Sequence, residues 1–490
     1  MQNFKKVTLG NSRYQTEHPQ VLRSFDGVSR SKTSPAEGNL SSYLFKASSG
    51  SFLIQVGFAG LAFLNSFILA RLLGTEGYGA FSNAMAWVSL LLIPASFGFG
   101  TLIVREVAIY RSRHEWGHLR GLLRFADILN LGLSCIFAIV LVSTALMIFH
   151  APERENMKHT LIVAAPLIPL FALLKIRESA SRGLEHVIRA QLPEMIFRPG
   201  LFLLGMVALY ITWPEHLSTP TAMGINVIAA AVALAVSTLW LKMLLPSKAK
   251  YDKPESKPIT WLKAAFPMLI YGSSQIMLGQ TDIIMLGGIR GDEETGLYTA
   301  ASRFAYLLVY VMISIEVILA PIMARLYYAK KKEQLQKILT RRARIAFLTV
   351  LPLGLALILG GRRFLAIFGP GFLVAQSVLA ILAFGRLIDV AAGSGALLLG
   401  MTGYEGTVAV VLSGSVLGNV LLNALLIPRY GAGGAAVASV IILVSAKLLL
   451  SIYAVKRTGV HVTIFGAWSK SLPVRLNKLL RKYKKVSCKQ

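Results

Sequence analysis

The sequence predicts an all-α integral membrane protein with twelve transmembrane helices in two six-helix lobes around a central cleft. Its 490 residues are 54% hydrophobic and only 15% charged, and its mean hydropathy is +0.60. Soluble domains contain about 45–50% apolar and about 25% charged residues. The apolar residues come in blocks of about 20, the length that a helix needs to cross a hydrocarbon core of about 30 Å. Helices rather than barrel strands are therefore expected to span the membrane.

The apolar blocks between polar breaks give the expected helices in order. They cover residues 49–70, 80–104, 126–149, 160–177, 194–213, 222–244, 262–286, 298–324, 345–360, 374–399, 408–427 and 433–455. An even number of spans places both termini on one side of the membrane. Lys and Arg concentrate in the second, fourth, sixth and eighth connecting loops, and cytoplasmic loops retain positive charge during insertion. We therefore expect a multi-pass protein of the cell inner (plasma) membrane with both termini in the cytosol.

The spans divide the chain into segments of different character. We expect a disordered cytosolic arm over 1–43, a first six-helix lobe over 44–245, a cytosolic linker over 246–261, a second six-helix lobe over 262–456 and a basic cytosolic tail over 457–490. The arm is polar, rich in Ser and basic residues, and lacks the apolar core of a signal peptide.

The formal net charge of +28 follows largely from this loop topology. No nucleic-acid-binding motif accompanies the charge, so we expect no nucleic acid partner. In the tail, Leu476, Leu479 and Tyr483 recur at helical spacing among Lys and Arg residues, which is typical of an amphipathic helix on a membrane surface. Anionic lipid headgroups are the partners that this segment favours.

Cysteine and histidine usage gives no indication of metal chemistry. The two cysteines, Cys135 and Cys488, are too few and too far apart for a Cys-based metal site or a disulfide framework. The eight histidines do not cluster. We expect no metal and no cofactor.

Two stretches suggest an internal repeat. Residues 73–91 and 286–308 each run from the end of an odd-numbered helix through a short acidic turn into an even-numbered one. When they are aligned, the residue pairs that superpose are Gly79 and Gly296, Phe81 and Tyr298, Ala84 and Ala301, Trp87 and Phe304, and Leu90 and Leu307. Such duplication is typical of transporters that bind their substrate between two lobes. The alternative is that any two short exterior hairpins share glycine and acidic residues.

Four stretches resemble the Wzx-type oligosaccharide flippases of bacterial polysaccharide synthesis, which belong to a superfamily with multidrug exporters and lipid II flippases. They are ARLLGTEGYGAFSNAMAWVSLL at 70–91, TDIIMLGGIRGDEETGLYTAASRFA at 281–305, FGPGFLVAQSVLAILAF at 368–384 and NVLLNALLIPRYGAGGAAVAS at 419–439. In the last stretch Asn419 and Asn423 share one helix face, where we expect them to hydrogen-bond a neighbouring helix. We expect Pro428 to end that helix and Gly431 to permit a tight turn into the next helix.

The resemblance implies a substrate and a mechanism. The family carries polyprenyl-diphosphate-linked oligosaccharide units from the cytoplasmic to the outer leaflet by alternating access, with no covalent chemistry, and delivers them toward a polysaccharide polymerase. Hydroxyl groups and a diphosphate cannot cross hydrocarbon unpaired, so a polar cleft with cationic side chains is expected. The product would enter O-antigen, capsule or exopolysaccharide synthesis.

Ionisable residues inside spans are costly and are therefore candidates for substrate binding or coupling. The candidates are Asp282, Arg303, Lys447, Arg71, Arg198, Glu316, Arg386 and Asp389. No catalytic residue and no metal ligand is expected.

Structural explanations compete with a functional role at each of these positions. For Asp282 and Arg303, an ion pair between adjacent helices is as well supported as a substrate or coupling role. Arg386 and Asp389 are three residues apart and would neutralise each other. Arg198 lies near the cytosolic end of its span and would snorkel to the interface.

The remaining three candidates differ in how easily they are explained. Lys447 has no obvious local partner, Glu316 is a coupling carboxylate or a hydrated residue near a helix end, and Arg71 is a cation near the outer mouth.

Two other functions compete with the flippase. A cation-coupled multidrug exporter of the same superfamily would share the two lobes. Such exporters commonly carry an ionisable or ion-coordinating site in the first lobe, whereas the first helix here, SFLIQVGFAGLAFLNSFILARLL, contains no carboxylate. A membrane-embedded polysaccharide polymerase needs acid/base groups in a sizeable exterior loop. The exterior loops are short, and Asp292, Glu293 and Glu294 form a hydrated turn without a companion base. We therefore expect the protein not to be an enzyme.

Overall fold

The computed structural model describes residues 36–148, 155–248 and 252–466. The chain forms two compact units, residues 1–52 and 53–490, and the description below concerns the second. Helix already begins at Ala36, so residues 36–43 of the predicted arm are helical. The amphipathic helix predicted within the basic tail lies outside the described residues.

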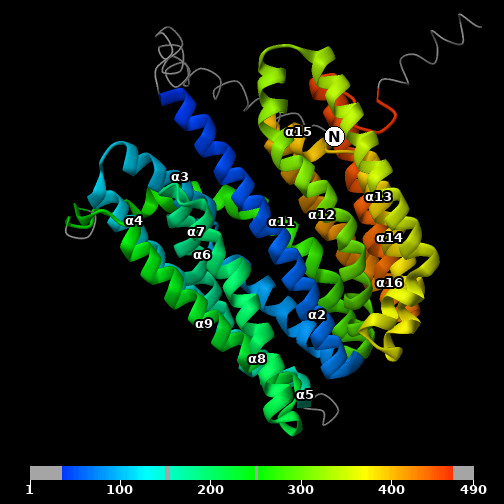
Figure 1. Cartoon of the computed structure of the whole chain (residues 1–490). Helices are drawn as coiled ribbons and strands as arrows, with labels where there is room; N and C mark the ends of the chain where they lie inside the picture. Colours follow the sequence, from blue (N-terminus) through cyan, green and yellow to red (C-terminus); the bar gives the residue numbers. More distant parts are fainter. Residues whose placement is uncertain (1–35, 149–154, 249–251, 467–490) are drawn as a thin grey trace, which may run out of the picture. The chain divides into compact units, whose positions relative to one another are not determined.

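The described residues form helices and no strands, which confirms the all-α prediction (Figure 1). The helices are α2 (Ala36–Ser96), α3 (Phe99–Ser112), α4 (Trp116–Ile148), α5 (Glu155–Ala164), α6 (Leu167–Gly183), α7 (Val187–Leu192), η2 (Pro193–Phe197), α8 (Arg198–Thr212), η3 (Pro214–His216), α9 (Thr219–Leu244), α11 (Pro258–Arg290), α12 (Asp292–Tyr328), α13 (Lys332–Phe368), η4 (Pro370–Ala375), α14 (Gln376–Ala392), α15 (Gly395–Met401) and α16 (Glu405–Thr458).

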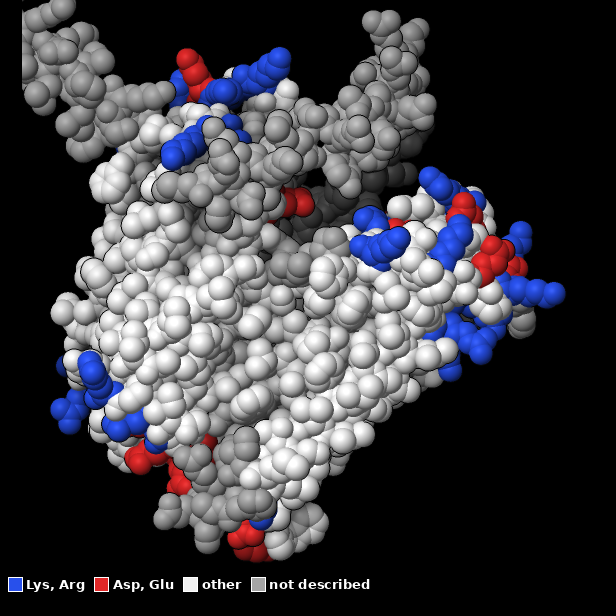
Figure 2. Space-filling view, turned by 180° about the vertical axis from the view of Figure 1, so that it is seen from behind, with Lys and Arg blue, Asp and Glu red and all other residues white. Residues whose placement is uncertain are grey.

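Eight helical segments among the described residues are long and apolar enough to cross a membrane, so the chain is a multi-pass membrane protein. They are Leu53–Ser96, Trp116–Met147, Glu155–Gly183, Val187–Thr212, Thr219–Leu244, Lys332–Phe368, Pro370–Ala392 and Glu405–Thr458. Figure 2 shows charged side chains gathered toward the ends of one face, with a broad uncharged area between them. That separation matches the polarity of a bilayer, because water is available only at the ends of membrane-spanning helices.

Two of the eight segments contain a sharp break at a glycine. Gly74 interrupts α2 with φ of 69°, and Gly431 interrupts α16 with φ of 54°. Both lie in the left-handed region, which glycine adopts without steric cost. The expected turn near the end of the chain is therefore present, but Pro428 does not end its helix. The helix continues through Pro428, and the turn falls at Gly431, where the backbone has the freedom that the turn requires.

The helices pack mainly in two sets. In the first, α3, α4 and α9 pack on α6, and α5 and α8 pack against α9. In the second, α12, α13, α14 and α16 pack on one another, with α15 and α11 against α16 (Figure 1). The start of the predicted tail packs on the second set. Val460 and Val462 are buried, and the Ile464 amide donates to the Ala391 carbonyl over 3.1 Å.

The two glycines aligned by the repeat meet in space. A Cβ atom on Gly79 of α2 would overlap the carbonyl oxygen of Asp292, and a Cβ atom on Gly296 of α12 would overlap the carbonyl oxygen of Thr75. Each helix therefore approaches the other through a glycine, and the contact is reciprocal. A pair of repeats related by a two-fold axis produces this kind of contact.

We predict that Gly296→Ala destabilises the folded protein by about 1–3 kcal/mol, because a methyl group there meets backbone that cannot rotate away. Gly288→Ala is the matched control, since no atom lies within 4 Å of the position of its Cβ. In a helix that change is neutral or stabilising by about 0.5–1 kcal/mol. Thermal unfolding of the detergent-solubilised protein measures both effects. Equal melting temperatures for the two variants would contradict the tight contact.

Candidate functional site

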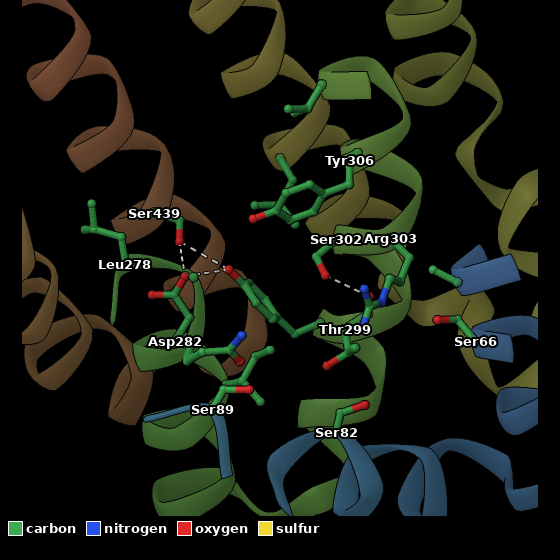
Figure 3. A pocket seen from close by; sticks show the side chains of 18 of the residues that line it. Ser66, Ser82, Ser89, Leu278, Asp282, Thr299, Ser302, Arg303, Tyr306 and Ser439 are labelled. Carbon is green, nitrogen blue, oxygen red and sulfur yellow. Dashed lines mark hydrogen bonds between the residues drawn. The ribbon is translucent and has the colours of Figure 1, made fainter. Parts of the chain in front are cut away.

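A cavity of about 620 Å³ lies between the two sets of helices, and residues of α2, α8, α9, α11, α12, α14 and α16 line it (Figure 3). Many of the lining side chains are polar. They include Asn65, Ser66, Ser82, Ser89, Asn226, Gln280, Thr299, Ser302, Tyr306, Asn419 and Ser439. Because an apolar wall would suffice for packing in a bilayer, so many hydrogen-bonding groups indicate a site for a polar ligand.

Most of the predicted site residues converge on this cavity. Those that line it are Asp282, Arg303, Lys447, Arg198, Arg386 and Asp389. They come from both halves of the chain. With four cations and two carboxylates, the lining carries a formal excess of positive charge.

Arg71 lies outside the cavity. The Arg71 guanidinium donates from Nε to the Ile367 carbonyl over 2.7 Å and from Nη2 to the Ala366 carbonyl over 3.3 Å. It therefore satisfies the last carbonyls of α13, a favourable place for a cation, and it does not line the cavity. Glu316 belongs to α12, but its side chain lies outside the described residues.

The Asp282 carboxylate is 3% exposed and accepts hydrogen bonds from neutral groups of α12 and both arms of α16. Oδ1 accepts from the Asn419 amide over 3.0 Å and from the Asn423 amide over 2.6 Å. Oδ2 accepts from the Tyr298 hydroxyl over 2.7 Å and from the Ser439 hydroxyl. Figure 3 shows Asp282 and Ser439 together. Four donors on a buried carboxylate stabilise its charge without a cation.

The expected ion pair between Asp282 and Arg303 is not formed. The neutral donors already occupy both carboxylate oxygens, and Figure 3 shows Arg303 on the opposite side of the view from Asp282. Among the described residues, the Arg303 guanidinium makes no hydrogen bond and no ion pair. It is exposed, and it also lines a smaller neighbouring cavity with Phe63 and Tyr310. Arg303 is therefore a cation whose partner would have to come from a ligand or water.

Lys447 does have a partner, contrary to expectation. Its Nζ lies 2.7 Å from Oδ1 of Asp389, and an Nη1 of Arg386 lies 3.5 Å from Oδ2 of the same carboxylate. The Asp389 carboxylate thus joins α14 to α16. The Arg386 guanidinium also lies 4.7 Å from the centre of the Tyr306 ring. The sequence correctly predicted the pairing of Arg386 with Asp389 but missed Lys447, which is remote in sequence.

Arg198 does not snorkel to an interface. Its guanidinium lies in the cavity wall, where Nη1 donates to Oδ1 of Asn226 over 3.5 Å and the charge lies 5.0 Å from the centre of the Phe171 ring. The residue begins α8 directly after the π-helical turn η2. Such turns are frequent at functional sites because they redirect side chains.

The sequence argument missed the neutral polar residues of the cavity. It selected ionisable groups, whereas Tyr298, Ser439 and Asn65 are neutral. Asn65 of α2 donates to the Pro199 carbonyl of α8 over 3.0 Å. A signal was available for Tyr298, which lies in the repeated stretch, and for Asn419 and Asn423, which were expected to bond a neighbouring helix.

Several solved structures share this fold. A multidrug resistance transporter of the MATE family and MOP superfamily, in an inward-facing conformation, superposes with a TM-score of 0.68 at 16% identity, covering 82% of this chain and 94% of that chain. The lipid II flippase MurJ, in an inward closed conformation, gives 0.62 at 15% identity, covering 82% and 87%. A MOP superfamily transporter from Pyrococcus furiosus gives 0.59 at 14% identity, covering 85% and 95%.

Two sequence families also match parts of this chain. The family described as polysaccharide biosynthesis protein matches residues 45–327, more than half of the chain, and the MatE family matches residues 267–425. No curated protein matches the chain. The resemblance inferred from the four sequence stretches is confirmed: the chain belongs to the polysaccharide biosynthesis protein family, and its fold is that of transporters of the MOP superfamily.

Proposed function

We propose that the protein is a flippase that moves polyprenyl-diphosphate-linked oligosaccharide units across the bacterial inner membrane, from the cytoplasmic to the outer leaflet, for polysaccharide synthesis. The observation that carries the proposal is the excess of cations in a polar cavity between the two halves of the chain. Membership of a polysaccharide biosynthesis family supports the same substrate class.

The fold of this flippase would have twelve spans in two six-helix lobes. The breaks at Gly74 and Gly431 divide two of the eight apolar segments into two helices each. The long helices α11 and α12 would supply two more. Twelve spans with basic even-numbered loops would put both termini in the cytosol.

Each chemical part of the substrate has a counterpart in this arrangement. The diphosphate would meet Arg303, which has no partner among the described residues, and a guanidinium binds two phosphate oxygens at once. Sugar hydroxyls would exchange water for the amide and hydroxyl groups of the lining, so that none crosses the bilayer unpaired. The polyprenyl tail would stay in hydrocarbon and need no protein site.

Alternating access would use the contact between Gly79 and Gly296. The acidic turn at Asp292 is an exterior loop in the proposed topology, so this contact lies at the outer end. Because the helices there touch backbone to backbone, the outer end would be closed, and delivery to the outer leaflet would require α2 and α12 to separate. Opening and closing at this contact would expose the cavity to each leaflet in turn.

Asp282 is the best candidate for coupling transport to a proton or sodium gradient. Its carboxylate faces four neutral partners and no cation among the described residues. A proton or a sodium ion would neutralise the carboxylate and change which of its four partners donate a hydrogen bond to it. These partners lie on α12 and on both arms of α16. Binding there would therefore alter the packing of these helices.

The alternative is a cation-coupled multidrug exporter of the same superfamily. The MatE match over residues 267–425 and the likeness to multidrug transporters support it. A cationic drug, however, needs an available carboxylate. Asp282 is saturated with hydrogen bonds, and Asp389 is held by Lys447 and Arg386, so the cavity favours an anion. A polymerase is the least supported function, because the cavity residues that the structure describes offer no free pair of acid and base.

The sidedness of lipid-linked oligosaccharide in cells that lack the protein tests the proposal. A membrane-impermeant glycan probe, used with and without permeabilisation, should find the units only on the cytosolic side, and re-expression should move them outward. Single units displayed outside would indicate a polymerase defect instead. Normal sidedness in a strain with no second flippase would contradict the proposal.

We predict that Arg303→Ala lowers outward transfer at least about tenfold, since one charge-assisted contact contributes about 1.5–3 kcal/mol. Arg303→Lys should recover part of the activity because it keeps the charge but not the bidentate geometry. Arg290→Ala is the matched control, because Arg290 pairs with Glu294 over 2.9 Å outside the cavity. Transfer by Arg303→Ala at the rate of the control would argue against a substrate role for Arg303.

We predict that Asp282→Asn abolishes gradient-driven transport in proteoliposomes while downhill exchange continues, because the amide carries no titratable or cation-binding charge. Asn423→Ala serves as the control, since it removes one donor from the same carboxylate but leaves the charge. A variant Asp282→Asn that still responds to a proton or sodium gradient would show that another group couples transport.

A further inference from the structure

The side chain of Tyr306 is an exposed aromatic surface inside the cavity. Tyr306 belongs to α12, is 39% exposed, and lines both the main cavity and its smaller neighbour. Figure 3 shows its ring on the same helix as Arg303 and Ser302. Its hydroxyl makes no hydrogen bond within the part of the chain that the structure describes. Aromatic rings that remain exposed in a pocket are typical contact surfaces for a ligand.

The ring is held by a chain of charged contacts. The Arg386 guanidinium of α14 lies 4.7 Å from the centre of the Tyr306 ring, and the ring attracts that cation. The guanidinium lies 3.5 Å from Oδ2 of Asp389, whose Oδ1 lies 2.7 Å from Nζ of Lys447. The orientation of the ring is therefore fixed before a ligand arrives. A preorganised contact surface loses less conformational entropy when it binds.

The position of the ring on α12 relates it to the cation proposed for the diphosphate. Arg303 and Tyr306 are three residues apart, so they share one face of the helix. A rise of about 1.5 Å per residue separates their Cα atoms by about 4.5 Å along the helix axis. In the proposed substrate the first sugar is bonded directly to the diphosphate. A diphosphate bound at Arg303 would therefore bring this sugar beside the ring of Tyr306.

We propose that Tyr306 is the platform on which the sugar next to the diphosphate stacks. A pyranose carries C–H groups on its faces and hydroxyl groups around its rim. One face therefore packs on an aromatic ring, while the rim needs hydrogen bonds from polar groups such as the Tyr306 hydroxyl. The inference rests on the proposed function and adds to it a residue that recognises the sugar rather than the charge.

A purely structural role for Tyr306 makes a different prediction. If the ring served only to hold Arg386 in place, its removal would disturb a cation of the cavity. Binding of the diphosphate would then weaken to the same extent whether or not a sugar is attached. A stacking role weakens binding only when the sugar is present. The ratio of the two affinities therefore separates the two roles.

Equilibrium binding of two short-chain ligands to the purified full-length protein measures that ratio. The ligands are farnesyl diphosphate and the same lipid with a disaccharide on its diphosphate. Tyr306→Leu should weaken binding of the glycosylated ligand about three- to tenfold, because one aromatic contact is lost, and should leave binding of farnesyl diphosphate unchanged. Tyr306→Phe should retain most of the affinity because it keeps the ring. Tyr210→Leu is the matched control, since Tyr210 is also exposed but lies outside the cavity.

Equal losses for the two ligands in Tyr306→Leu, or full affinity for the glycosylated ligand in that variant, would overturn the inference and leave the proposed function standing. If Tyr306→Leu does not fold, Tyr306→Met takes its place in the same comparison, because it fills a similar space without a ring. A parent protein that binds neither ligand would contradict the proposed function itself, and the inference with it.

Discussion

A charge inside a bilayer must be paired, hydrogen-bonded or exposed to a polar cavity, because hydrocarbon offers no other compensation. The buried charges of this protein follow that rule in different ways. Asp282 is compensated by four neutral donors, and Asp389 by Lys447 and Arg386. Arg303 alone among the cations of the cavity lacks any such compensation from the described residues. The pattern leaves one strong cation available in a polar space.

The same pairings connect helices that must move if the cavity is to face both leaflets. Asp282 ties α11 to α12 and to both arms of α16, so these segments would move together. The contact of Gly79 with Asp292 ties α2 to α12 by packing and by a long hydrogen bond, which the Asn83 amide donates to Oδ1 of Asp292 over 3.4 Å. Separation of α2 from α12 there breaks this long hydrogen bond, whereas the Asp282 carboxylate with its four donors resists separation. The weak contact is therefore the natural place for a gate.

Most of the fold could be predicted from the hydrophobic blocks and the glycine positions of the sequence. Most of the expected ranges fall within helices because apolar length reflects the bilayer directly, and the resemblance placed the chain in its family. The spans expected at 80–104 and 374–399 are each interrupted, after Ser96 and after Ala392. The turn lies at Gly431 as expected, but the end of the preceding helix was misplaced at Pro428, because a proline near a helix end is tolerated. The pairing of Lys447 with Asp389 joins residues on different helices, and periodicity within one helix contains no information about it.

Neutral polar residues show a second limit of sequence reasoning. Tyr298 and Ser439 are ordinary in a transmembrane segment, and only their convergence on Asp282 gives them a role. The expected ion pair between Asp282 and Arg303 is not formed for this reason, because neutral donors occupy both oxygens of the Asp282 carboxylate. A single sequence identifies the costly groups, but the structure decides which neighbours compensate them.

Translocation by the purified protein tests the central claim most directly. Proteoliposomes carrying a fluorescent polyprenyl-diphosphate disaccharide in both leaflets are exposed to an impermeant quencher, in parallel with vesicles loaded with a cationic dye. The account predicts protein-dependent exchange of the glycolipid between leaflets and no movement of the dye. Movement of the dye with no exchange of the glycolipid would contradict it and assign the cavity to cation export.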